Sequence, residues 1–217
     1  MKKIFALILA LALIFCFAAC GKADSTEEPK NDNTSATTVE VEDLLSEKGG
    51  FLEYTYSNHV INDKGQIESR QVSGDSRRTD TFEYDDQGRV VKVTRSSAYG
   101  DEIWTYTYDE NGLLIEEFQG DRTFNNTYTL DDQNRVKTKT SVNADSGYTM
   151  VYTYTYNEDG TVATETQASE TSTYELTFTY DQKGRVVKQV AVNLEDFSPS
   201  TTIYTYGVVG TYTPKAE

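Results

Sequence analysis

The sequence predicts an all-β protein: an antiparallel meander of about seven β-hairpin repeats that curls into a flattened barrel or a two-layer sheet. Composition supports this class, because 16 Tyr residues stand beside only 3 Pro, and aromatic residues favour strands. Apolar and polar residues also alternate with a period of two over most of the chain. A small turn residue recurs every 22 to 26 residues, at positions 65, 88, 112, 134, 160, 184 and 210.

The first nineteen residues are predicted to be a secretory signal peptide. Lys2 and Lys3 precede an apolar run that is shorter than the ~20 residues of a membrane-spanning helix, and small residues come directly before Cys20. The segment 17–20, Phe-Ala-Ala-Cys, resembles the bacterial lipobox, with Phe17 in place of the usual aliphatic residue. This resemblance implies lipidation of Cys20 and a cell-membrane or outer-membrane protein, lipid-anchored and facing outside the cytoplasm.

Residues 20–47 are predicted to be the lipidated cysteine and a disordered acidic linker, because the stretch after Cys20 is rich in Ser, Thr, Asn, Asp and Glu. Residues 48–217 then form the hairpin-repeat domain.

Each repeat is expected to be two strands joined by a tight turn. In residues 82–92, Asp85 occupies the first position of a type I turn and Gly88 the fourth. This matches a three-residue hairpin loop in which Gly88 is the left-handed bulge residue. This geometry pairs Asp85 with Arg89. The turn residues of the five central repeats are Asp85, Gly88, Asp109, Gly112, Asp131, Asn134, Asn157, Gly160, Asp181 and Gly184.

Aromatic residues stand six and four positions before the turn residue, and Val, Leu or Ile stands two after it. One face of the sheet is therefore aromatic, and the other carries Thr, Glu and Lys. Eleven such aromatics would present about 1,600 Å² of apolar surface, more than monomers usually expose. The sheet must therefore curl over this face, and tyrosine rather than leucine indicates a wet interior.

The segments 106–114 and 178–186 resemble the YD repeats of Rhs-type proteins, which are strand–turn–strand units that coil into β shells. The chain is also similar to uncharacterised bacterial lipoproteins whose repeat domain closes into a porin-like barrel. These resemblances imply an architecture and no activity, and the chain lacks the length for a shell around cargo.

Composition excludes several functions. The net charge of −15, which becomes −17 without the leader's two lysines, argues against nucleic acid as a partner. Cys16 lies in the leader, so disulfides and thiolate metal sites are not expected. His59 is the one histidine and is expected at the surface or an edge. No cofactor, metal or catalytic residue is predicted, because the acidic pairs occupy turn positions where Asp serves the turn.

We therefore predict a membrane-anchored, non-enzymatic lipoprotein whose repeat domain acts in binding or envelope structure, with a partner in the envelope that is unknown. Binding candidates are Trp104 on a strand and Tyr99, Phe124 and Tyr148 on the irregular rim opposite the turns. The alternative for these aromatics is that they pack in the core or seal the open end. Two other functions stay open: a carrier of a small amphipathic ligand or glycan in the tyrosine-lined interior, and a hydrolase of envelope polymers.

Overall fold

A computed structural model describes residues 38–50 and 52–215, which form strands and connecting turns. The fourteen strands are β1 (Val39–Gly49), β2 (Leu52–Ile61), β3 (Ile67–Gly74), β4 (Arg78–Tyr84), β5 (Val90–Ser97), β6 (Gly100–Tyr108), β7 (Leu114–Gln119), β8 (Arg122–Leu130), β9 (Val136–Asn143), β10 (Thr149–Tyr156), β11 (Val162–Ala168), β12 (Thr173–Tyr180), β13 (Val186–Asn193) and β14 (Pro199–Tyr212). The predicted signal peptide, Cys20 and most of the predicted linker lie outside the described residues.

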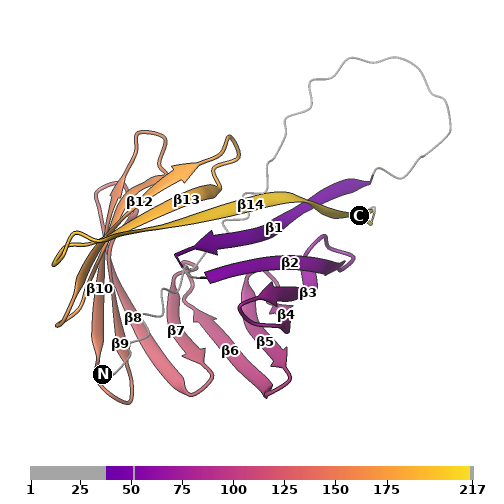
Figure 1. The fold of residues 1–217 in the computed structure, drawn as a ribbon, viewed down its shortest axis with the longest axis horizontal. Helices are drawn as coiled ribbons and strands as arrows, with labels where there is room; N and C mark the ends of the chain where they lie inside the picture. The colour runs from indigo at the N-terminus through magenta and orange to yellow at the C-terminus, as the bar shows by residue number, and fades with distance from the viewer. Residues whose placement is uncertain (1–37, 51, 216–217) are drawn as a thin grey trace. The chain divides into compact units, whose positions relative to one another are not determined.

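The strands form one antiparallel meander that closes into a barrel (Figure 1). Each strand from β2 to β14 pairs with its neighbours in sequence, and β1 closes the ring between β14 and β2. The all-β class and the antiparallel hairpin meander are confirmed, and the sheet closes fully. No helix among the described residues is long and apolar enough to cross a bilayer.

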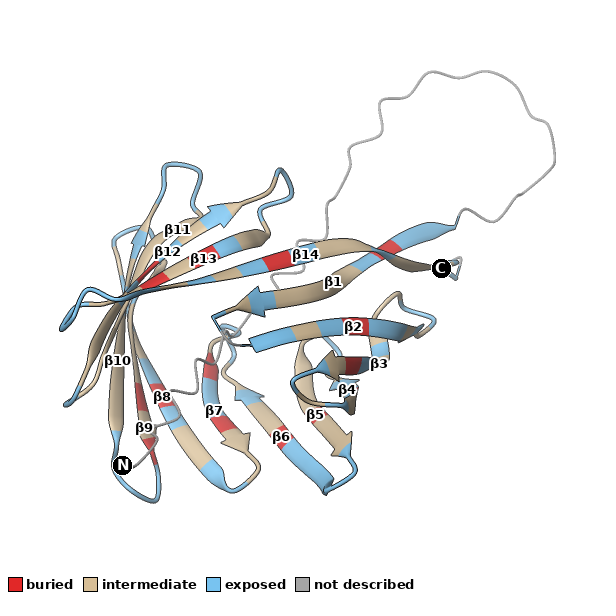
Figure 2. Cartoon of the chain, viewed as in Figure 1, coloured by how far each residue is buried: buried red, intermediate tan, exposed pale blue. Residues whose placement is uncertain are grey.

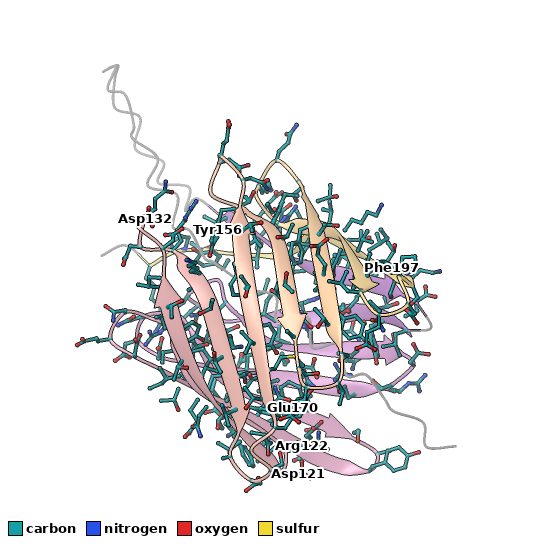
Figure 3. The ribbon with its side chains drawn as sticks, turned by 90° about the vertical axis from the view of Figure 1, so that its left-hand side faces the viewer. Asp121, Arg122, Asp132, Tyr156, Glu170 and Phe197 are labelled. Carbon is teal, nitrogen blue, oxygen red and sulfur yellow. The ribbon has the colours of Figure 1, made fainter. Side chains whose placement is uncertain are left out.

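Six tight turns join β2 to β3, β4 to β5, β6 to β7, β8 to β9, β10 to β11 and β12 to β13, and all lie at one end of the barrel, here called the turn rim. The other connections, here called the loop rim, lie at the opposite end. Figure 3 shows this separation, with Asp132 of a tight turn at one end and Asp121, Arg122 and Glu170 at the other.

The seventh repeat differs from the prediction. Gly210 is not a turn residue, because β14 runs without a break and pairs Gly210 with Val41 of β1. The strand that the seventh hairpin lacks is supplied by β1: Tyr204 pairs with Glu47 as Tyr106 pairs with Glu117. The N-terminal strand thus completes the last repeat.

The linker is shorter than the sequence predicts. Acidic composition predicts a linker as far as residue 47, but residues 39–47 belong to β1. Val39 and Val41 alternate there with Glu40 and Glu42, and Val41 is buried. Two alternating valines among acidic residues were too short a pattern to predict a strand.

Strand alternation divides the side chains between lumen and outer face. Buried residues form isolated bands along the strands, as Figure 2 shows. They include Val72, Val93, Trp104 and Leu176, together with the polar Asp80, Glu117, Asn126 and Gln189. On the outer face, threonine hydroxyls meet across strands, as between Thr129 and Thr138 (2.6 Å).

Candidate functional site

The turn rim is built from one Asp or Asn side chain per tight turn. Asp85 Oδ1 accepts hydrogen bonds from the backbone N–H groups of Gln87 and Arg89 (3.0 and 2.9 Å), and Oδ2 accepts from Arg89 Nε (2.7 Å). The N–H of Gly88, at a φ of 78°, donates to the carbonyl of Asp85 (3.0 Å). The same turn forms at Asp109, Asp131 and Asp181, and at Asn157 with Gly160. Asn134 replaces glycine with a φ of 62°.

These carboxylates are fully used by the turn and its arginine. The hydrogen bond from the Arg135 side chain is the largest cause of a lowered pKa at Asp131. The lowered pKa keeps Asp131 ionised, and the turn acids stand on separate hairpins. The acidic turn positions are therefore structural.

A tyrosine hydroxyl ties each repeat to the one before it. Tyr108 donates to the carbonyl of Val90 (2.9 Å), where a register shift ends the ladder of the preceding hairpin. The equivalent bonds are Tyr84 to Ile67 (2.7 Å), Tyr156 to Val136 (2.6 Å) and Tyr180 to Val162 (2.8 Å). In the repeat that carries Leu130 at this position, Tyr128 donates to Leu114 instead (2.7 Å).

The turn arginine reaches forward to a tyrosine of the next repeat. The Arg89 guanidinium stacks on Tyr108 of the next repeat, 4.6 Å from the ring centroid, and Arg135 and Arg185 stack likewise on Tyr156 and Tyr206. Arg89 and Val90 belong to the same repeat, so Tyr108 is held twice by the repeat before it, as Tyr156 is by Arg135 and Val136.

Deeper in the lumen, the aromatic residue six before the turn in the five central repeats faces a residue five after it, and Tyr204 faces a residue of β1. This ring of cross-strand pairs, here called the lumen belt, comprises Phe82 with Val93, Tyr106 with Glu117, Tyr128 with Lys139, Tyr154 with Glu165, Phe178 with Gln189, and Tyr204 with Glu47. Sequence reasoning placed the aromatics on this face but missed the ionisable residues between them. Their signal was a polar residue at the same position of successive repeats.

The belt holds charges away from bulk water. Burial raises the pKa of Glu117 and of Glu165, while the amide of Gln119 (2.5 Å) and that of Gln167 (2.6 Å) donate to them. Burial lowers the pKa of Lys139, and the charges of Glu117 and Glu165 act against that shift. An acid–base–acid row therefore spans β7, β9 and β11.

The belt is not a filled core. Tyr106, Tyr128 and Tyr154 are only partly buried, although they face inward. A round barrel of ~14 strands is too wide for its side chains to fill. Solvent therefore reaches the rings, as expected for tyrosine in a wet interior.

A second charged cluster lines β1 to β4. The side chain of His59 is 4% exposed and its Nε2 lies 3.0 Å from Asp43 Oδ2, so the expectation of a surface or edge residue was wrong. Arg70 Nη1 donates to the same carboxylate (2.9 Å) and stacks on Tyr56, 4.3 Å from the centroid. Burial lowers the pKa of His59. A bulge at Asn58, which has a φ of 51°, precedes His59 and could not be read from the sequence.

The four predicted binding residues do not form one surface. Trp104 on β6 is 4% exposed and belongs to the barrel wall, and Phe124 on β8 lies opposite Glu117 on the same lumen face. Tyr99 is fully exposed and Tyr148 is 43% exposed on two separate connections of the loop rim. Phe197 is 73% exposed on a third connection, with a φ of 58°.

Glu117 and Glu165 of the lumen belt are too far apart to act together as a glycosidase pair. Glu117 and Glu165 stand on β7 and β11, four strand spacings or about 19 Å apart along the wall. A glycosidase needs its two carboxylates within about 10 Å. Among residues 38–50 and 52–215, no group of three or more His, Cys, Asp or Glu side chains is placed to hold a metal ion.

Comparison with known proteins agrees with the repeat structure. No curated protein is significantly similar in sequence. A porin-like protein from Bacteroides uniformis ATCC 8492 is similar in structure, with a TM-score of 0.39 and 16% identity over 77% of this chain and 98% of that chain. Residues 46–208, about three quarters of the chain, match the family model of the teneurin YD-shell. The resemblance to YD repeats is confirmed, and the chain belongs to the teneurin YD-shell family.

Proposed function

We propose that this protein is a lipid-anchored, extracytoplasmic binding protein that holds a small amphipathic ligand or glycan in the barrel lumen without turning it over. The observation that carries the proposal is the lumen belt, in which partly exposed tyrosine rings alternate with glutamate, lysine and glutamine. Rings offer flat apolar faces, and the side chains between them offer hydrogen bonds, which is the usual composition of a ligand site.

The outer face supports a barrel that stands in water. Thr107, Thr155 and Thr179 occupy outward positions, and Lys92 pairs with Glu83 there (2.6 Å). Lipid-facing barrels instead carry an apolar band outside and polar residues within. The inward tyrosines and outward threonines thus favour a tethered domain over a pore.

The entry point of the chain supports an outward-facing loop rim. β1 begins at Val39, opposite Tyr212 at the turn rim, and runs to Gly49 at the loop rim. Eighteen residues separate Cys20 from Val39. A lipid on Cys20 would therefore hold the turn rim nearer the membrane and leave the loop rim free.

Ligand binding is tested with Trp104, the one tryptophan of the chain, which reports from the barrel wall. We expect a saturable change in its fluorescence when the full-length protein is titrated with a neutral trisaccharide or a neutral naphthylamine probe. Tyr152→Ala, which removes a ring of the lumen, should weaken binding about tenfold. Thr153→Ala, one residue along the same strand but exposed outside, is the matched control.

Two results would overturn lumen binding: no saturable response to either probe, or equal affinities in the two variants. Release of cleaved sugar or peptide from envelope material would refute the absence of turnover.

The anchor is tested separately by labelling cells with a radioactive fatty acid. We expect label on the wild type and none on Cys20→Ser, which should remain as precursor or leave the membrane fraction. Label retained by Cys20→Ser would show that the lipid is attached elsewhere or that no lipobox operates.

A further inference from the structure

Arg95 is a half-buried cation whose Nε has no hydrogen-bond partner among the residues that the structure describes. It lies on β5 with its side chain toward the lumen, opposite Asp80 on one side and Glu102 on the other. Among the residues that the structure describes, its buried Nε has no hydrogen-bond partner, and no carboxylate comes within ion-pair distance of the guanidinium. Burial is the largest cause that lowers its pKa, followed by the charge of Arg78.

The two acids beside Arg95 are directed elsewhere. Asp80 is 2% exposed, and it accepts a hydrogen bond from Arg78 Nε (2.7 Å) and lies 3.9 Å from Arg70 Nε. Glu102 is exposed, and its carboxylate lies against Gly120 on the loop rim, 3.1 Å from where a Cβ would stand. The site therefore contains a guanidinium whose N–H groups are oriented by its neighbours but not satisfied by them.

A second unfilled donor lies beside the first. The Arg95 guanidinium stacks 3.6 Å from the centroid of the Trp104 ring, and the buried indole Nε1 of Trp104 also lacks an acceptor among residues 38–50 and 52–215. Both groups only donate hydrogen bonds. Unfilled buried donors are costly to the fold and are usually matched by a partner.

We propose that Arg95 and Trp104 form an oxyanion subsite in the lumen, which binds the carboxylate or sulfate group of an acidic ligand. This inference rests on the proposed lumen binding and specifies the ligand chemistry. A planar guanidinium binds such groups through paired, charge-assisted hydrogen bonds. The indole N–H supplies a further donor, while Tyr106 on the strand of Trp104 and Phe124 on β8 offer rings for the body of the ligand.

The net negative charge of the protein opposes the binding of an anion at this subsite. The net charge of −15 repels anions at long range, but salt screens this over about 8 Å under physiological conditions. Asp43 and Asp80 pair with Arg70 and Arg78, so Arg95 is the cation of this part of the lumen that no described carboxylate pairs with. Local charge therefore governs recognition once an acidic group has entered.

The test follows the indole N–H signal of Trp104 by NMR and the affinity by calorimetry, in the full-length protein. Three probes are compared: trigalacturonate, a neutral galactose trisaccharide and inorganic sulfate. We expect trigalacturonate to bind at least tenfold more tightly than the neutral sugar and to shift the indole signal. Arg95→Met, which keeps most of the side-chain volume, should abolish that preference.

Arg122→Met is the control, because it removes the same charge from an exposed position on the loop rim and should leave the preference intact. A shift with sulfate alone also supports the subsite and shows that the anionic group suffices. Equal affinities for acidic and neutral sugars would overturn the subsite while leaving lumen binding in place. So would an unchanged preference in Arg95→Met. Failure of both sugars to bind would overturn both proposals.

Discussion

A single hydroxyl group links each repeat to its predecessor, so the tyrosines of this repeat family have a structural role before any functional one. We expect Tyr180→Phe to lower the free energy of unfolding by about 1 kcal/mol, because it removes only the hydrogen bond to the carbonyl of Val162 (2.8 Å). Denaturant melts of the purified protein measure this loss. Tyr99→Phe, at a fully exposed ring, is the control and should melt like the wild type. An equal loss in both variants would show that the bond contributes nothing specific.

The left-handed turn residue gives a second prediction. Gly184→Val should cost about 1–2 kcal/mol or more, because its φ of 75° is unfavourable for a β-branched residue. No atom outside the turn lies within 4 Å of the added Cβ, so the cost isolates backbone strain. Asn134→Gly, at a φ of 62°, should be neutral or stabilising in the same melts. A harmless Gly184→Val would contradict this account of the turn.

Residue-level prediction succeeded where one residue type satisfies one local geometry. Asp85 and Gly88 are fixed by the turn that they form, and a reader of the sequence can find them by spacing. Glu117, Lys139 and Glu165 occupy inward positions where alternation predicts apolar residues. Their placement depends on the width of the lumen, which only barrel closure determines.

At the scale of elements, the N-terminal strand decides whether the sheet closes. β1 pairs with β14 from Val39 to Gly49 but with β2 only from Ser46 to Gly49. It is therefore the second strand of the seventh repeat, contributed from the other end of the chain. The sequence could not show this, because pairing between residues so far apart leaves no local pattern.

Deleting residues 39–49 should therefore expose the edges of β14 and β2. Unpaired edges invite pairing between molecules, so we expect loss of the cooperative thermal transition together with oligomers on size-exclusion chromatography. The full-length variant Leu44→Val, which keeps all of β1, is the control and should remain monomeric. A truncated chain that melts cooperatively as a monomer would refute the role of β1 in closure.

At the scale of the whole molecule, one repeat pattern produces two different rings. Near the turn rim the same turn hydrogen bonds recur in each hairpin, and three of the six turns add an aspartate–arginine pair. Further inside, the paired positions differ from repeat to repeat, from Val93 through Glu117 to Gln189. The regular ring near the turns holds the barrel together, and the variable ring sets the chemistry of the lumen.

The charges of that variable ring make stability depend on pH. Burial raises the pKa of Glu165 above its ordinary value of 4.5, so the folded protein holds this proton more tightly than the unfolded chain. Below pH 4.5 both states are protonated and the group costs nothing. As the pH rises through the raised folded pKa, ionisation in the lumen becomes unfavourable and stability is lost.

Glu165→Gln should therefore be more stable than the wild type at pH 7, with the difference shrinking to zero near pH 4. Gln can still accept the hydrogen bond from Gln167, and Lys139 keeps Glu117 as a neighbouring charge. Denaturant melts at several pH values measure the difference, and Glu170→Gln on an exposed connection should show none. If the wild type is the more stable protein at pH 7, Glu165 is stabilised by Lys139 beyond its desolvation cost, and the lumen is a paired network. The outcome expected here is the opposite, a lumen that holds charge at the expense of stability, as a site kept for binding would.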